Sequence, residues 1–222
     1  MGSVKSLVFG AIIWFALSSA PLGRAGAALI AEARSTPDAD LVSSRVRRAF
    51  LLFLVAFVLV SFVYFQSLST LGLQVHARGF TNAVYCALLS VNGLLILIFA
   101  VTLTTLIRRA DLRLIIVSGF LCLALGFGLT AFAATLPFLI TTVALCTVGE
   151  MLYSPASAAY VANLAPANQR GRYQGAWGLT AGVGLILAPA IGARLFAWNP
   201  GALWLLCGVL GVVAAIIIDI GD

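Results

Sequence analysis

Charged residues are scarce in this 222-residue chain, which has 13 Lys and Arg, 7 Asp and Glu, and a net charge of +6. Soluble domains have about a quarter of their residues charged, and these help to cover the surface with polar groups. Here charged residues make up 9% of the sequence and hydrophobic residues 62%, and the mean hydropathy is +1.11. This composition argues against a water-soluble domain and predicts that the chain lies in a lipid bilayer.

Lysine and histidine occur once each, as Lys5 and His76, and the four cysteines show no C-x-x-C spacing. Neither a zinc site nor a disulfide framework is indicated, so we expect no metal and no other cofactor. The other basic residues are arginines scattered between apolar runs, a pattern that argues against nucleic acid as a partner. One loop histidine and one mid-span carboxylate cannot form a catalytic dyad, and we therefore expect no enzyme activity.

Long charge-free stretches alternate with short charged segments along the sequence. A membrane-spanning helix needs about 20 apolar residues. The stretches predict about seven such spans, at residues 6–31, 49–72, 81–107, 113–132, 136–164, 173–195 and 201–220. We therefore expect an all-α polytopic transmembrane bundle, with a first helix within residues 1–33 and an Arg-rich linker at residues 34–48.

The basic residues also predict how the chain is oriented, because Lys and Arg are retained on the cytoplasmic side. If the first span runs inwards, ten basic residues lie inside and three, Lys5, Arg78 and Arg194, lie outside. This predicts a multi-pass inner-membrane protein with its N-terminus outside and its C-terminus in the cytoplasm. The alternative is a signal peptide, with Lys5 before the apolar run 7–17 and a small-residue site ending at Ala20.

Glu150 lies near the middle of the fifth predicted span, where an ionised carboxylate is costly and its presence usually indicates function. Helical periodicity places it on one face with Thr147, Ser154 and Ser157. A polar stripe of this kind faces a bundle interior or a water-filled cavity. We expect Glu150 to exchange protons or to bind a cationic group; the alternative is a protonated side chain that hydrogen-bonds a neighbouring helix.

Further polar residues lie at a similar depth in the second and third predicted spans. Together with Glu150 and Ser154, they make up the predicted solute or proton pathway: Tyr64, Gln66 and Asn92. Amide side chains both donate and accept, which suits a solute in a low-dielectric site. Interhelical hydrogen bonds in bilayers contribute about 0.6–2 kcal/mol, so a packing role is the alternative for Gln66 and Asn92.

The sixth predicted span has small residues on one face, at steps of three or four residues. Such a face lets another helix approach closely. The predicted helix-packing residues are Gly175, Gly178, Gly182, Pro189 and Gly192.

Several short motifs resemble the C-terminal half of the major facilitator superfamily, in its drug:proton antiporter-like bacterial branch. The main ones are GEMLYSP from Gly149, ANLAP at 162–166, QRGRY at 169–173 and APAIG at 188–192. VYFQ at 63–66 and LSVNGLL at 89–95 support them. The resemblance covers nearly the whole chain: the first span is similar to helix six of such a transporter, the linker to its central inner loop, and residues 49–222 to the six-helix C-terminal half.

The resemblance implies secondary active transport of a small solute, with proton-coupled efflux by alternating access of two halves. Its implied partners are the lipid bilayer, the solute, protons and an N-terminal half, against which the glycine-rich helix would pack. The implied gating loops contain Arg108, Arg109, Asp111, Arg113, Arg170 and Arg172. Residues 106–114 lack the family's glycine-led gating motif and keep only its charges.

Three alternatives remain at this point. The chain could be a half-transporter that needs a partner or a second copy, or a membrane fragment that does not transport by itself. A seven-helix receptor or photoreceptor has the same topology, but a retinal protein needs a Schiff-base lysine in its last helix. Lys5 is the only lysine in the sequence, and it lies at the opposite end of the chain.

Overall fold

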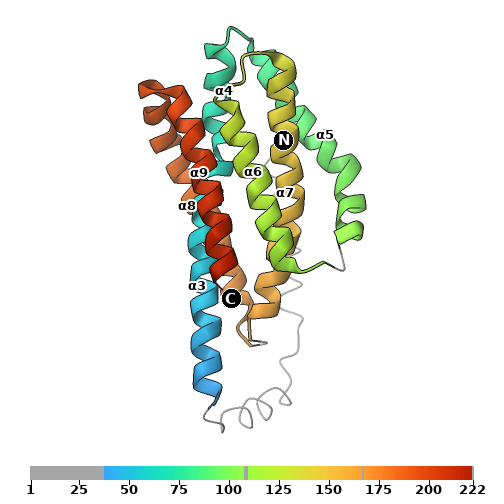
Figure 1. The fold of residues 1–222 in the computed structure, drawn as a ribbon, viewed down its shortest axis with the longest axis vertical. Coiled ribbons are helices and arrows are strands. Elements are labelled where there is room, and N and C mark those ends of the chain that lie inside the picture. Colours follow the sequence, from blue (N-terminus) through green and yellow to red (C-terminus); the bar gives the residue numbers. More distant parts are fainter. Residues whose placement is uncertain (1–37, 108–109, 167, 222) are drawn as a thin grey trace, which may run out of the picture. The chain divides into compact units, whose positions relative to one another are not determined.

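The computed structural model describes residues 38–107, 110–166 and 168–221, so the predicted span at 6–31 and Arg108 and Arg109 lie outside the described residues. Throughout the described part, every regular element is a helix (Figure 1). The helices are α3 (Asp38–Tyr64), α4 (Gln66–Ala77), α5 (Asn82–Ile107), α6 (Leu112–Thr130), α7 (Leu136–Leu164), α8 (Arg170–Trp198) and α9 (Pro200–Ile220). The all-α class expected from composition is confirmed.

Residues from Val46 onward form one compact unit. Six of its helical segments are long and apolar enough to cross a membrane, and α3 and α4 together supply the first of them, Val46–Ala77. Each corresponds to one of the six spans predicted after the linker. Helix α3 begins at Asp38, within the predicted linker 34–48. Arginine residues are unfavourable in lipid, but they are good helix formers. Residues 38–71 also contain no proline or glycine that would end a helix. The helix can therefore begin in the linker, before the membrane span.

The span predicted at 49–72 is broken in its middle, where Phe65 separates α3 from α4. The hydroxyl of Ser67 donates to the Tyr64 carbonyl oxygen at 2.7 Å, and the hydroxyl of Ser69 donates to that of Phe65 at 3.0 Å. Side chains that insert into the ladder of backbone hydrogen bonds are a recognised cause of helix kinks. Hydropathy could not predict this break, because Val46–Ala77 is apolar enough on average to count as one span despite the polar residues near Phe65.

Close approaches between backbones hold α6, α7 and α9 together. A Cβ atom on Gly149 of α7 would lie 2.7 Å from the carbonyl oxygen of Gly119 on α6, and one on Gly211 of α9 would lie 2.7 Å from Cβ of Ala124. Glycine is required where backbones come this close. The α6–α7 and α6–α9 pairs are the most extensively packed in the unit.

An aromatic cluster fills the interior where α3, α6, α7 and α8 meet. The ring of Phe57 packs edge-on against Phe120, Tyr153 and Trp177, with centroids 5.4–5.8 Å apart. Helix α5 lies at one edge of the unit and packs against α7 and α4 (Figure 1). Its position leaves much of its apolar surface exposed, and its membrane-span window is only 6% buried.

Candidate functional site

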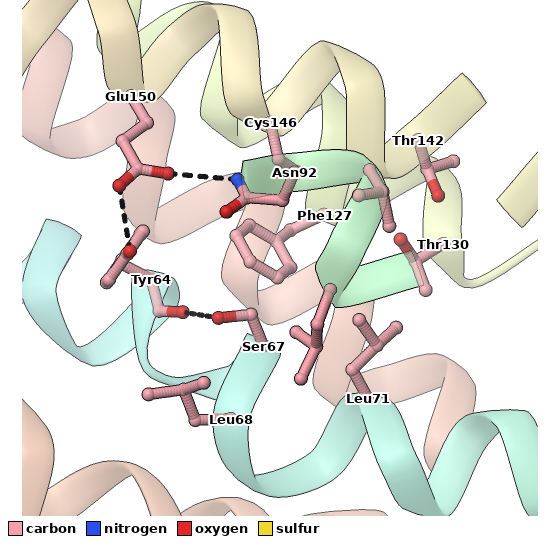
Figure 2. A pocket seen from close by; sticks show the side chains of 12 residues that line it. Tyr64, Ser67, Leu68, Leu71, Asn92, Phe127, Thr130, Thr142, Cys146 and Glu150 are labelled. Carbon is pink, nitrogen blue, oxygen red and sulfur yellow. Dashed lines mark hydrogen bonds between the residues drawn. The ribbon is translucent and has the colours of Figure 1, made fainter. Parts of the chain in front are cut away.

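Glu150 of α7 is held by side chains from two other helices (Figure 2). The Tyr64 hydroxyl, at the end of α3, donates to Glu150 Oε1 at 2.8 Å. Asn92 of α5 donates through Nδ2 to Oε2 at 3.1 Å and to the Thr147 hydroxyl at 2.9 Å. Three of the predicted pathway residues, Tyr64, Asn92 and Glu150, therefore meet at one place. Thr147, which shares a face of α7 with Glu150, lies beside them.

The local sequence explains why these groups can meet. Tyr64 is the last residue of α3, so the break at Phe65 lies directly beside the carboxyl site. Beyond the break, the carbonyl oxygen of Ser67 accepts a hydrogen bond of 3.1 Å from the Tyr85 hydroxyl of α5. Thr147 Oγ1 donates to the Val143 carbonyl oxygen at 2.8 Å and so presents its lone pairs to Asn92. The donors to the carboxyl group are thus fixed by their own helices.

A recess extends from Glu150 between α4, α5, α6 and α7, with a cavity volume of about 70 Å³. Polar groups lie at its two ends: Tyr64, Ser67, Asn92 and Glu150 at one, and Thr130 and Thr142 at the other (Figure 2). The lining between them is mainly apolar. Its members are Leu68, Leu71, Leu89, Phe127, Val143 and Cys146.

Glu150 also borders a second, wider hollow of about 360 Å³, between α5, α7 and α8. Ser154, the fourth predicted pathway residue, lines this hollow together with Trp177 and Pro155. Among the residues that the structure describes, none that lines either hollow is basic. The carboxyl group is thus bordered by neutral side chains on both sides.

Gln66, the remaining predicted pathway residue, points elsewhere. It is fully buried, its Nε2 donates to the Ala188 carbonyl oxygen of α8 at 3.4 Å, and its Oε1 accepts from the Thr70 hydroxyl at 2.8 Å. Glycine at position 192 makes room for it, since a Cβ there would collide with Gln66 Oε1. The structure thus places Gln66 at a helix contact, and it lines neither hollow described above.

The predicted packing face of α8 divides between two environments. At Gly175, Gly178 and Gly182 a Cβ atom would have no neighbour within 4 Å, and Pro189 is exposed. Gly192 instead packs against α4, on a face that it shares with the buried residues Gly184 and Ala188. Most of the predicted face therefore points away from this helical unit.

The predicted gating residues lie at helix ends. Asp111 caps α6 by accepting a hydrogen bond of 2.9 Å from the Arg113 backbone N–H, and Arg113 forms an ion pair of 3.5 Å with Asp219 near the end of α9. Arg170 and Arg172 are exposed in the first turn of α8. The ion pair links the start of α6 to the end of α9 within the one compact unit.

Some lining residues were missed from the sequence although a signal was present. Thr142 and Cys146 precede Glu150 at steps of four residues, so the polar stripe could have been extended along α7 in that direction. Phe127 and Thr130 of α6 had no such signal. They belong to the recess because glycines let α6 approach α7 closely, and that contact depends on tertiary structure.

The fold and this site define a polytopic helical membrane protein with an interior carboxyl group between two hollows. The chain belongs to the Major Facilitator Superfamily, whose family model matches residues 76–219. It is 28% identical over 196 residues to YttB, an uncharacterized MFS-type transporter of Bacillus subtilis, an alignment that covers 87% of this chain and 48% of YttB. The chain thus spans about half the length of this curated relative.

Solved structures show the same fold. A crystal structure of a POT family transporter in complex with a thioalcohol-conjugated peptide matches with a TM-score of 0.70 and 18% identity, over 98% of this chain and 51% of that one. A second, in complex with 5-aminolevulinic acid, matches with a TM-score of 0.70 and 17% identity, over 98% and 51% of the two chains. At this level of identity the similarity concerns the fold alone.

Proposed function

We propose that this chain is the C-terminal part of a secondary active transporter, of the drug:proton antiporter-like branch, that exports a small solute in exchange for protons. In this proposal Glu150 binds either a proton or a cationic group of the solute. The observation that carries it is the setting of Glu150: a mid-span carboxyl group with two neutral donors and, in the described residues, no basic group lining the adjacent hollows.

The coupling follows from the cost of an uncompensated charge. An acidic side chain at the centre of a membrane helix costs about 2.5–3.5 kcal/mol on insertion scales. Hydrogen bonds from Tyr64 and Asn92 reduce this cost without adding a countercharge. A bound proton or a bound cation removes it, and the two compete for the same oxygens. A solute released outwards is then replaced by a proton from outside.

We further propose that the six-helix half works with an N-terminal half, by alternating access around Glu150. Two observations support this: the chain spans about half of its relatives, and the exposed glycine face of α8 has no partner within the described unit. In this arrangement the arginines at the inner helix ends, Arg113, Arg170 and Arg172, belong to the inner gate. The protein would lie in the inner membrane, with residues 1–33 forming an additional helix and the C-terminus in the cytoplasm.

Replacing Glu150 by Gln in the complete transporter tests the proposal. Gln keeps the shape and accepts from one donor, but it can neither bind a proton at neutral pH nor neutralise a cation. We expect proton-driven flux into proteoliposomes to fall at least tenfold, while the amount of protein in the membrane and its thermal unfolding stay unchanged. Proton-driven flux at the wild-type rate would refute the role of Glu150.

Two control substitutions distinguish the effect of losing the Glu150 charge from the effect of changing the recess. Thr141→Val and Thr142→Val remove the same hydroxyl from neighbouring positions of α7, where Thr141 is exposed and Thr142 lines the recess. Both hydroxyls bond to carbonyl oxygens of their own helix. Neither substitution changes a charge, so we expect both variants to keep proton coupling. Loss of coupling in either would mean that coupling does not depend on Glu150 alone.

A further inference from the structure

The recess beside Glu150 has an open end and a closed end. Leu68, at its mouth, is 56% exposed, whereas Thr130 and Thr142 at the far end are each 2% exposed. Figure 2 shows Glu150 and Thr142 at opposite sides of this space. A group can therefore enter past Glu150 and Leu68 and is stopped at the two threonines.

The closed end is poorly suited to water. The hydroxyls of Thr130 and Thr142 donate to the Gly126 and Leu139 carbonyl oxygens, each at 2.9 Å, so a water molecule at this end would find two acceptors and no donor. A buried water needs two to four polar partners, and cavities with apolar walls stay dry. The walls here come mainly from leucine, valine and phenylalanine side chains. An apolar occupant matches this lining better than a chain of water molecules does.

The volume limits what the occupant can be. An apolar cavity of about 150 Å³ holds benzene, with six carbon atoms. By the same proportion, the 70 Å³ recess holds about three carbon atoms. An empty cavity lowers stability in proportion to its volume, which gives the protein a reason to fill this one when the solute binds.

We propose that the recess is a specificity subsite, which takes a short, unbranched aliphatic substituent of a primary amine whose ammonium group lies on Glu150. This inference rests on the proposed function, since it assigns the cation to Glu150. It adds a size limit of about three carbon atoms that is set inside one half of the transporter, between α4, α5, α6 and α7. The wider hollow on the other side of Glu150 is left for the rest of the solute.

The test uses the full 222-residue chain in lipid nanodiscs, because the recess lies within one helical unit. Radiolabelled propylammonium is bound in equilibrium dialysis and displaced by alkylammonium ions from methyl to hexyl, with protein-free nanodiscs correcting for partition into lipid. Each buried methylene contributes about 0.8 kcal/mol, so affinity rises about fourfold per carbon up to propyl. Beyond propyl we expect it to level off or fall.

Two substitutions of one wall residue move the size limit in opposite directions. Val143→Ala enlarges the recess and shifts the best-binding amine to a longer chain, whereas Val143→Ile shortens it. Val148→Ala is the matched control, because Val148 lies on the same helix but lines a different hollow, with Leu95 and Phe99. A purely structural role of Val143 would change all amines alike and would not move the optimum.

The outcomes separate the two proposals. An affinity that keeps rising through hexylammonium, or an optimum that the Val143 variants do not move, would overturn the subsite. If Glu150→Gln nevertheless abolishes propylammonium binding, the role of Glu150 stands without the subsite. If this variant binds propylammonium as well as the wild type does, the cation is not on Glu150 and the subsite fails, whereas proton binding by Glu150 is decided separately by the flux of the Glu150→Gln transporter. No binding of any amine to the wild-type chain would also overturn the subsite.

Discussion

At Glu150, the carboxyl group depends on its two donors. The Tyr64 hydroxyl is the closer of them, at 2.8 Å from Oε1. A hydrogen bond to a charged group contributes about 1.5–3 kcal/mol, and each 1.4 kcal/mol corresponds to a factor of ten. We therefore predict that Tyr64→Phe lowers the initial rate of proton-driven flux in proteoliposomes at least tenfold, without preventing membrane insertion.

Tyr173→Phe is the matched control, because it removes the same hydroxyl from a ring that packs against Phe50, with centroids 4.2 Å apart. Tyr173 lines neither of the two hollows beside Glu150. Its variant should transport at the wild-type rate. Equal losses in the two variants would mean that the tyrosine effect is structural and unrelated to Glu150.

A buried hydrogen bond between two side chains joins α4 to α9. Trp204 Nε1 donates to Gln74 Oε1 at 3.1 Å, and both side chains are almost completely buried. Interhelical hydrogen bonds in membranes contribute about 0.6 kcal/mol on average and up to about 1.7. A double-mutant cycle of Trp204→Phe and Gln74→Leu, read by unfolding in mixed micelles, should give a coupling energy in this range. A coupling near zero would mean that this bond does not stabilise the fold.

The residues of the site show what a single sequence can predict. Glu150, Tyr64 and Asn92 are polar side chains inside apolar spans, and such groups seek one another in a bilayer; the structure brings them together. Gln66 satisfied the same criterion but bonds to α8. Gln66 is the first residue of α4, directly after the break at Phe65, and hydropathy does not indicate where that break lies.

At the scale of the helices, stability depends on how closely α6 and α7 approach. A Cβ at Gly149 would meet the Gly119 carbonyl oxygen at 2.7 Å and the Leu123 backbone nitrogen at 2.9 Å. Backbone atoms cannot move aside without shifting a helix, and overpacking typically costs about 1–3 kcal/mol. We predict that Gly149→Ala lowers the free energy of unfolding of the chain by this amount, measured by denaturation in detergent micelles.

Gly178→Ala provides the comparison for this prediction. A Cβ at Gly178 has no neighbour within 4 Å, so the free energy of unfolding should change by no more than about 0.5 kcal/mol. The two glycines are equally conspicuous in the sequence, and only the structure shows which one is a packing contact. A loss of stability as large for Gly178→Ala as for Gly149→Ala would contradict the arrangement of α8.

The helices themselves were largely predictable, because most spans are long apolar runs between charged segments, and Pro137 marks the start of the one that follows an uncharged turn. What sequence could not supply was the face that each helix turns to its neighbours. Such spans are apolar on all sides, and the hydrophobic pattern therefore carries little directional signal. In α8, the small residues lie on two faces, and the buried one contains Gly184, Ala188 and Gly192.

At the scale of the whole molecule, the exposed glycine face of α8 is the surface that bears on assembly. Gly175, Gly178 and Gly182 are exposed there, and small residues let helices pack closely in a membrane, where van der Waals contact drives association. The matched relatives are about twice as long as this chain. In the proposed function, this face of α8 packs against the N-terminal half.

This predicts that Gly178→Leu disrupts assembly and not folding. A Cβ at position 178 meets no atom within 4 Å in the described unit, but a leucine side chain would hold an approaching helix away. A steric cost of about 1.4 kcal/mol or more weakens association at least tenfold. Co-purification of a tagged N-terminal half with the chain in mild detergent measures this. Val209→Phe, an enlargement on the exposed face of α9, should leave association unchanged. If Gly178→Leu associates as well as the wild type does, the glycine face of α8 is not where the two halves meet.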